Sequence, residues 1–251
     1  MKMSSFITKT LVSLTLGFGI VSGMSAANAA SIVPQLEGEV ETTNLTPGCV
    51  DATKCIDTTS YGYKVTSLDF DGTGGYGQSR LFVDKKGTNN TYSGAGLSIQ
   101  FGANDIGTNS HVDEYWFRPV AILENGTLPE NGELEVGLFE FNFDNILSEI
   151  TLSFLDVEDI ATKILEVNGA AYNYQLPAGA NNAVQTVTLK DVKSFKVHLG
   201  NGNSSRFTTG DGVLLQGNVS VPEPTAVLGL GTLAVAGVVG LRQRKKTSQA
   251  V

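Results

Sequence analysis

The chain has few of the residues on which enzyme chemistry most often depends. Its 251 residues include two histidines, two cysteines and one tryptophan. It contains neither a G-x-S-x-G nucleophile elbow nor an H-E-x-x-H metal-binding pair. His198 alternates with apolar residues, which predicts that it faces solvent from a strand, and His111 lies in a polar segment. The sequence therefore gives no support to a serine or zinc hydrolase, and no residue is assigned a catalytic role.

Basic residues are also scarce, and many lie near the two ends. The chain has 17 Lys and Arg against 25 Asp and Glu, and residues 1–29 and 225–251 hold six of the basic residues and none of the acidic ones. The segment between them keeps 25 acidic and 11 basic residues, a formal charge of about −14. Nucleic acids and anionic membranes are bound chiefly through cations that face phosphates. The charge of the segment argues against both as partners.

The first 29 residues have the order of features found in a signal peptide. Lys2 and Lys9 are followed by an apolar run, Leu11–Met24, and then by Ala27 and Ala29 at the small-residue positions that a signal peptidase reads. An uncleaved membrane anchor is the alternative, but about 14 helical residues rise only ~21 Å against a hydrocarbon core of ~30 Å. We therefore expect signal peptidase to cleave after Ala29.

The last thirty residues combine a proline motif, an apolar helix and a basic cluster. The motif is Val221, Pro222, Glu223 and Pro224; the apolar run is Ala226–Leu241; the basic cluster is Arg242, Arg244, Lys245 and Lys246, followed by the tail 247–251. Sixteen helical residues reach only ~24 Å, which is short for a permanent span. The basic cluster would stop transfer and hold that end on the cytoplasmic side.

This ending, residues 221–246, resembles a PEP-CTERM sorting signal. The resemblance implies that an exosortase, a membrane transpeptidase-like enzyme, recognises the motif and removes the transmembrane helix. The alternative is an ordinary single-pass anchor behind a proline-rich stalk. The resemblance therefore predicts a precursor that the membrane holds only until its tail is processed.

The segment 30–220 is long enough for one domain, and its pattern is that of β-strands. Short runs rich in Val, Ile, Phe, Tyr and Thr are separated by Gly, Asn and Pro, and helical periodicity is nearly absent. We predict an all-β fold, an antiparallel β-sandwich or jelly roll of about ten strands. The expected strands are 63–70, 80–83, 97–101, 115–123, 134–143, 149–155, 164–167, 170–174, 184–189, 192–199 and 213–219.

Two local features of these strands can be predicted in detail. Asn168-Gly169 between apolar runs favours a tight hairpin with a type I′ turn, because both central residues must take positive φ. In residues 134–143 the apolar positions change phase, from Leu134, Val136 and Leu138 to three phenylalanines. Either a bulge near Gly137–Phe139 or a strand buried on both faces would explain that change.

Two segments of this region resemble the LEVG family of PEP-CTERM proteins. They are Glu114–Ala121, which reads EYWFRPVA, and Glu133–Gly137, which contains the family motif Leu134, Glu135, Val136 and Gly137. The resemblance implies export and placement at the cell surface or in the extracellular matrix. It implies no activity and no catalytic residue.

The two cysteines and the acidic loops suggest structural roles. Cys49 and Cys55 lie close together in a turn-rich stretch, which in an oxidising compartment predicts a disulfide more strongly than a metal site. Structural calcium is a further prediction, because loops rich in Asp, Asn and Gly can supply oxygen ligands. Ordinary turn chemistry is the alternative. The candidate ligands are Asp69 and Asp71, and the cluster Asp156, Glu158 and Asp159.

Aromatic residues offer a possible contact with carbohydrate. Exposed rings stack on sugars, and amides or carboxylates beside them supply hydrogen bonds. Trp116, within an apolar strand, is expected in the core, whereas tyrosines in glycine-rich segments, Tyr76 and Tyr92 above all, are expected to be freer. The other candidates are Tyr61, Tyr63, Tyr172 and Tyr174.

These observations predict a non-enzymatic, exported protein of the cell surface or extracellular matrix. Its partners would be signal peptidase and exosortase during processing, and afterwards exopolysaccharide or matrix proteins. One alternative is a carbohydrate-active enzyme that uses paired carboxylates, with Asp113 and Glu114 or the Asp156 cluster as candidates. A permanently anchored envelope protein is the other.

Overall fold

The described part of the chain is built almost entirely of β-strands. The computed structural model describes residues 29–46, 48–70, 76–103, 114–129, 134–201 and 212–220. The helices within these ranges are two short 3-10 turns, η1 (Ala52–Lys54) and η2 (Thr58–Tyr61), and no described helix is long and apolar enough to cross a membrane. The predicted all-β class is confirmed. The predicted helix 226–241 and basic cluster lie outside the described residues.

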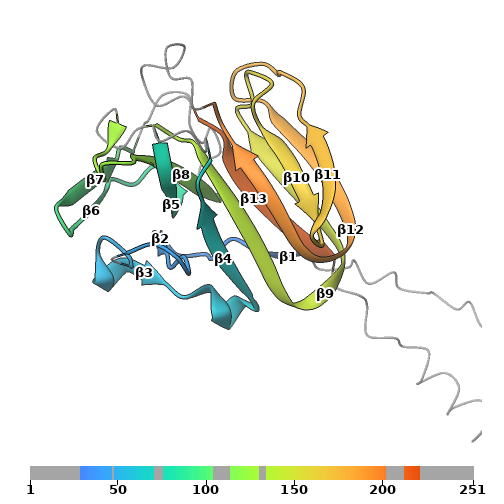
Figure 1. Cartoon of the computed structure of the whole chain (residues 1–251), viewed down its shortest axis with the longest axis horizontal. Coiled ribbons are helices and arrows are strands. Elements are labelled where there is room, and N and C mark those ends of the chain that lie inside the picture. The colour runs from blue at the N-terminus through green and yellow to red at the C-terminus, as the bar shows by residue number, and fades with distance from the viewer. Residues whose placement is uncertain are drawn as a thin grey trace, which may run out of the picture.

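Eleven of the thirteen described strands form one sheet. Its order is β11-β10-β12-β9-β13-β8-β5-β2-β3, with β1 paired to β13 and β4 paired to β9, while β6 and β7 form a separate hairpin (Figure 1). The pairing of β2 with β3 is parallel, as is an isolated bridge between Thr42 and Val65, and the other described strand pairings are antiparallel. The strand bounds are β1 Ala29–Ser31, β2 Gly38–Val40, β3 Cys55–Ile56, β4 Tyr63–Leu68, β5 Tyr76–Lys85, β6 Asn90–Gly94, β7 Leu97–Phe101, β8 Tyr115–Leu123, β9 Gly137–Leu155, β10 Lys163–Val167, β11 Ala170–Gln175, β12 Val184–Leu199 and β13 Leu214–Ser220.

The long strand β9 organises the sheet. Its first half pairs with β4, its second half pairs with β13, and β12 pairs with both halves. The prediction of separate strands at 134–143 and 149–155, and at 184–189 and 192–199, is therefore wrong. The polar residues that suggested turns occupy an exposed bend of β9 and β12, where the register shifts between Val192 and Ser194 and Asp191 takes a φ of 53°. Figure 1 shows β9 curving through this bend.

The change of hydrophobic phase in residues 134–143 has a different cause from either predicted one. The register of β9 with β12 and β4 is continuous from Leu138 to Asn142, so there is no bulge at Gly137–Phe139. Leu138 is only half-buried, so the second predicted cause, a strand buried on both faces, does not apply. Leu134 and Val136 instead precede the strand in a tight turn, in which the Val136 amide donates to the Leu134 carbonyl at 3.0 Å.

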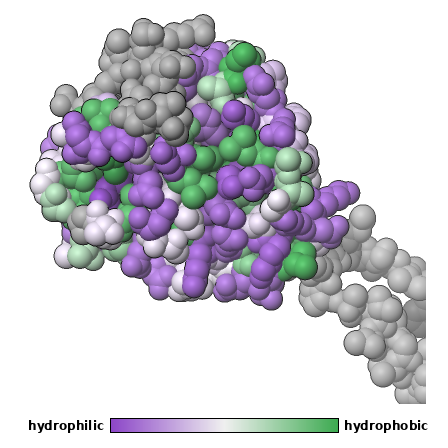
Figure 2. Space-filling view, in the orientation of Figure 1, coloured by the Kyte–Doolittle hydropathy of each residue, from purple (hydrophilic) through white to green (hydrophobic). Residues whose placement is uncertain are grey.

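Aromatic side chains from β4, β8, β9 and β12 meet in the main core. Phe141 stacks on Phe195 with ring centroids 4.8 Å apart and also contacts Phe117 and Tyr63. The Tyr63 hydroxyl donates to the carbonyl of Ile32 at 2.6 Å, which satisfies the one polar group of this cluster. Figure 2 shows hydrophilic residues over much of the surface in that view, with smaller hydrophobic patches between them.

The hairpin prediction is confirmed. Asn168 and Gly169 have φ of 55° and 74°, the positive values that a type I′ turn requires, and they join β10 to β11. The Asn168 side chain fastens the tip to β12, since its Oδ1 accepts from the amides of Lys193 and Ser194 and its Nδ2 donates to Asp191. The hairpin therefore occupies a fixed position at one end of the sheet.

Candidate functional site

The two segments that resemble the LEVG family meet in the interior. Arg118 from the first segment lies on β8, and its Nη2 is 2.5 Å from Oε1 of Glu135 in the second. Its Nη1 is 3.0 Å from Oδ2 of Asp84 on β5, and its guanidinium lies 4.1 Å from the centroid of the Phe101 ring. All three charged residues are buried. Burial without a partner is costly for a charge, so these contacts tie β5, β8 and the LEVG turn together.

The main chain of Glu135 is also closely enclosed. A Cβ added at Gly200 would lie 2.5 Å from the Glu135 carbonyl oxygen, and one added at Gly212 would lie 2.7 Å from it. The preceding residue, Leu134, accepts from the amide of Ala121 on β8 at 2.9 Å. Leu134, Glu135, Val136 and Gly137 are all buried. The motif therefore packs within the domain and offers no accessible surface for catalysis.

A second buried ion pair supports the disulfide loop. Arg80 on β5 pairs with Glu39 on β2 and donates from Nη1 to the Gly48 carbonyl at 2.8 Å. Glu39 also accepts from the amide of Val50, so the pair holds both sides of Cys49. The predicted Cys49–Cys55 disulfide is confirmed.

Burial raises the pKa of two carboxyl groups in these networks. The pKa of Glu39 is raised by desolvation against the opposing effects of Arg80 and the Val50 amide. The pKa of Asp84 is raised by the same cause, against the opposing charge of Arg118. A carboxyl group with a raised folded-state pKa contributes stability at low pH that is lost as pH rises through that pKa. Both carboxyl groups therefore contribute less to stability at neutral pH than at low pH.

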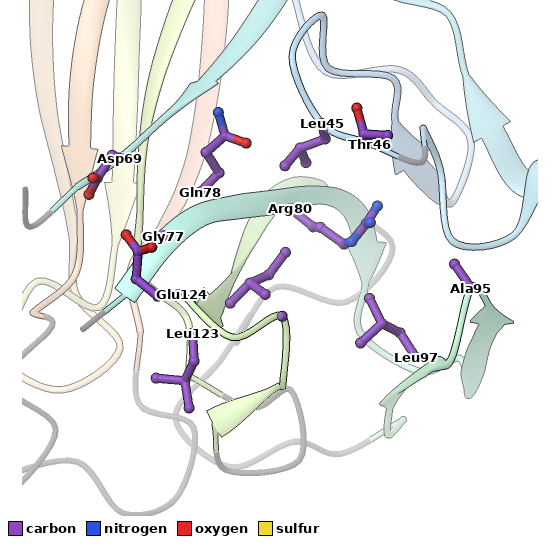
Figure 3. A pocket seen from close by; sticks show the side chains of 12 residues that line it. Leu45, Thr46, Asp69, Gly77, Gln78, Arg80, Ala95, Leu97, Leu123 and Glu124 are labelled. Carbon is purple, nitrogen blue, oxygen red and sulfur yellow. The ribbon is translucent and has the colours of Figure 1, made fainter. Parts of the chain in front are cut away.

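A cavity of about 540 Å³ lies beside the Arg80 pair. Figure 3 shows Asp69, Gln78 and Glu124 toward one side of it, Leu97 and Ala95 toward the other, and Arg80 between them. Leu45, Ile122 and Leu123 add apolar surface. Among the described residues that line the cavity none is aromatic, so a sugar ring there would lack a stacking partner. The cavity could accept a small polar molecule, but its lining does not define one.

The candidate calcium ligands are divided between two places. Asp69 lines the 540 Å³ cavity, whereas Asp156, Glu158 and Asp159 line a small cavity of about 10 Å³ at the end of β9; Asp71 lies outside the described residues. Asp156 Oδ1 accepts from the Asn182 amide at 2.6 Å, and Asp159 accepts from Ala161 and Asn201. Within the described ranges no group of three His, Cys, Asp or Glu could hold a metal ion. Structural calcium stays a prediction.

His198 is half-buried and does not face open solvent as its strand position predicts. Its ring stacks on Phe70 with centroids 6.0 Å apart, and the main chain of Ala161 hydrogen-bonds it. Desolvation lowers the pKa of His198 to about 4, and the charge of Lys163 acts in the same direction. The residue is therefore neutral at pH 7. His111, the other histidine, lies outside the described residues.

The aromatic residues separate clearly into buried and exposed sets. Trp116 is in the core, as predicted, at 2% exposure. Tyr92 is wholly buried against Phe82 and Phe101, so the prediction that it is free is wrong: the β6–β7 hairpin folds it inward. The side chain of Tyr76 is not described. Tyr63 is buried, and the exposed tyrosines are Tyr61, Tyr172 and Tyr174.

Tyr172 and Tyr174 form an aromatic pair on the terminal strand β11. Their ring centroids lie 6.1 Å apart with planes at 38°, and the side chains are 45% and 41% exposed. Asn173 lies between them with a φ of 50°, and Gln175 follows, donating to the Ile160 carbonyl at 2.7 Å. The pair and its neighbouring amides form the described surface best suited to stacking on a sugar. In the sequence, the Tyr-x-Tyr spacing of Tyr172 and Tyr174 is the feature that indicates this surface.

The comparisons with known proteins give no relative. No family model, no curated protein and no solved structure matches this chain. The class that the fold and these sites define is an all-β domain with buried ion pairs and an exposed aromatic pair at the edge of its sheet.

Proposed function

We propose that this chain is an exported, non-enzymatic protein of the cell surface or extracellular matrix, sorted by an exosortase and contacting exopolysaccharide. The resemblance of residues 221–246 to a PEP-CTERM signal carries the sorting part of the proposal. One feature of the sheet agrees with it: Ala29 on β1 is the register partner of Ser220 on β13. The expected cleavage point and the residue before Val221 are thus adjacent in the sheet. Both processing enzymes would act beside one pole of the domain.

The Tyr172 and Tyr174 pair carries the polysaccharide part of the proposal. Two rings about 6 Å apart present enough apolar area for successive sugar units, and the amide side chain of Asn173 can exchange hydrogen bonds with hydroxyl groups. We also infer that the curved sheet closes into a two-layer sandwich. Val83 on β5 and Phe195 on β12 share one core cluster although their strands are far apart in the sheet. A closed sandwich would present β11 at its margin.

Replacing both Tyr172 and Tyr174 with alanine is expected to weaken binding to the host's exopolysaccharide about tenfold or more, equal to about 1.4 kcal/mol. Affinity electrophoresis in gels that contain the polysaccharide measures the change. Tyr61→Ala is the matched control, because Tyr61 is a comparably exposed tyrosine on η2. Equal retardation of the double variant and the native protein would refute polysaccharide binding at this pair.

Processing at both ends is expected to appear in the intact mass of protein recovered from its native host. The extracellular fraction should lack residues 1–29 and the segment that follows the Pro222–Pro224 motif. A mature protein that keeps Arg242–Lys246 would instead establish the permanently anchored alternative. Membrane and extracellular fractions are measured separately, so that precursor and product are distinguished.

A carbohydrate-active enzyme is the competing proposal. The 540 Å³ cavity gives it a specific location, since the cavity lining contains two carboxylates, Asp69 and Glu124. Release of reducing ends from the polysaccharide by the native protein, lost in Glu124→Gln, would favour the enzyme. We expect no such release, since the described lining of the cavity lacks an aromatic platform for the sugar.

A further inference from the structure

The two ends of the eleven-stranded sheet are unlike each other. At one end lies β3, a strand of two residues that begins at the disulfide-bonded Cys55. At the other end lies β11, whose six residues are all exposed and which, among the described strands, pairs with β10 alone. A short strand beside a cross-link is a poor template for another chain, whereas a longer, open strand is a good one. A strand from another chain can therefore pair with β11.

The strand β11 itself carries no formal charge, and the charged register partners beside it on β10, Lys163 and Glu166, are of opposite sign. Residues 167–189 contain no Asp, Glu, Lys, Arg or His, although the segment 30–220 has a formal charge of about −14. Two copies of an acidic protein repel each other least where neither presents charge. Natural edge strands are commonly protected by lysine or proline, and β11 has neither. The charge distribution therefore favours a second copy as the occupant of this edge.

The hairpin geometry identifies a main-chain group that is available for pairing. Val167 and Ala170 flank the two-residue turn, and Glu166 is the register partner of Ala171. In such a hairpin the main-chain N–H and C=O groups of the two residues that flank the turn hydrogen-bond to each other. The main-chain groups of the next residue on each strand point away from the partner strand of the hairpin. The N–H and C=O of Ala171 are thus directed outward from the edge of the sheet.

We propose that β11 pairs antiparallel with β11 of a second copy, forming a weak, two-fold symmetric dimer. The contact is short, because six strand residues span only ~20 Å and the positive φ of Asn173 interrupts the strand. Such a small interface belongs to the transient class, with a Kd on the order of 0.1–1 mM. An isologous contact closes on itself, so the product is a dimer and not a fibre. On the proposed function, a dense extracellular matrix would supply the high local concentration that this contact requires.

Sedimentation velocity of the protein purified from its native host tests the proposal over a range of concentrations up to ~1 mM. The native protein should pass reversibly from monomer to dimer. Ala171→Lys and Ala171→Pro should each weaken dimerisation about tenfold or more, because one places like charges at the contact and the other removes an outward N–H. Ala180→Lys is the matched control: it adds the same charge to the same uncharged stretch, but in the loop after β11.

Three outcomes would overturn the proposal: a native protein that stays monomeric at ~1 mM, Ala171 variants that dimerise normally, or equal weakening by Ala180→Lys. Hydrogen exchange provides a second measurement, since protection of the Ala171 amide should rise with protein concentration. Circular dichroism checks that each variant is folded. The dimer does not depend on polysaccharide, so loss of sugar binding in the Tyr172 and Tyr174 variant and loss of dimerisation in the Ala171 variants are separate results.

Discussion

Replacing Glu135 with alanine is expected to lower the free energy of unfolding by about 3–5 kcal/mol, because the change leaves the Arg118 guanidinium buried without the carboxylate 2.5 Å from its Nη2. Both side chains are at most 2% exposed, so water cannot replace the lost partner. Urea unfolding followed by circular dichroism measures the change. The midpoint should fall while the slope of the transition is unchanged.

Glu166→Ala is the matched control for this variant. Glu166 also forms an ion pair, with Lys196 at 2.8 Å, but those side chains are 36% and 22% exposed. Removing a pair so exposed typically costs less than about 1 kcal/mol. A similar cost for both variants would contradict the buried arrangement. The triple variant Asp84→Asn, Arg118→Met and Glu135→Leu should recover much of the lost stability, because no charge of the network is then left buried without its partner.

Phe141→Ala is expected to lower the free energy of unfolding by about 3–5 kcal/mol, through lost burial and a cavity that its neighbours cannot fill. Phe141 is wholly buried and contacts aromatic rings from β4, β8 and β12, so its removal affects the centre of the curved sheet. Thermal unfolding should show a correspondingly lower Tm.

Ile146→Ala provides the control on the same strand. Ile146 is 68% exposed at the bend of β9, so its truncation should change stability by less than about 0.5 kcal/mol. If the two variants were equally destabilising, the assignment of the inward face of β9 would be wrong. Together the two substitutions test whether one continuous strand carries both the core and the exposed bend.

The position of Glu135 indicates what residues 134–137 do in the fold. Its carboxylate faces Arg118 in the interior and its main chain is enclosed by Gly200 and Gly212. The motif is a packing element that joins β8 to the turn before β9. Tyr172 and Tyr174 lie at the exposed surface instead, where the proposed contact with polysaccharide would form.

The sequence by itself determined the features that depend on neighbouring residues. It determined the all-β class, the type I′ turn at Asn168-Gly169 and the strands 97–101 and 115–123, because side-chain alternation and turn chemistry act over a few residues. It also indicated the Cys49–Cys55 disulfide, which closes a short loop. Each of these is specified within about ten residues of chain.

Only the tertiary structure decided the features that depend on distant segments. β9 continues through polar residues because the long strand β12 pairs with it on both sides of the bend, and Glu135 is buried because Arg118 and two distant glycines enclose it. The burial of a tyrosine likewise depends on which elements cover its strand. Tyr92 is buried, whereas Tyr172 and Tyr174 are exposed because β11 lies at the edge of the sheet, where a strand is covered least. Local alternation assigns a side chain to one face of a strand, but the packing of the whole chain determines whether that face is buried.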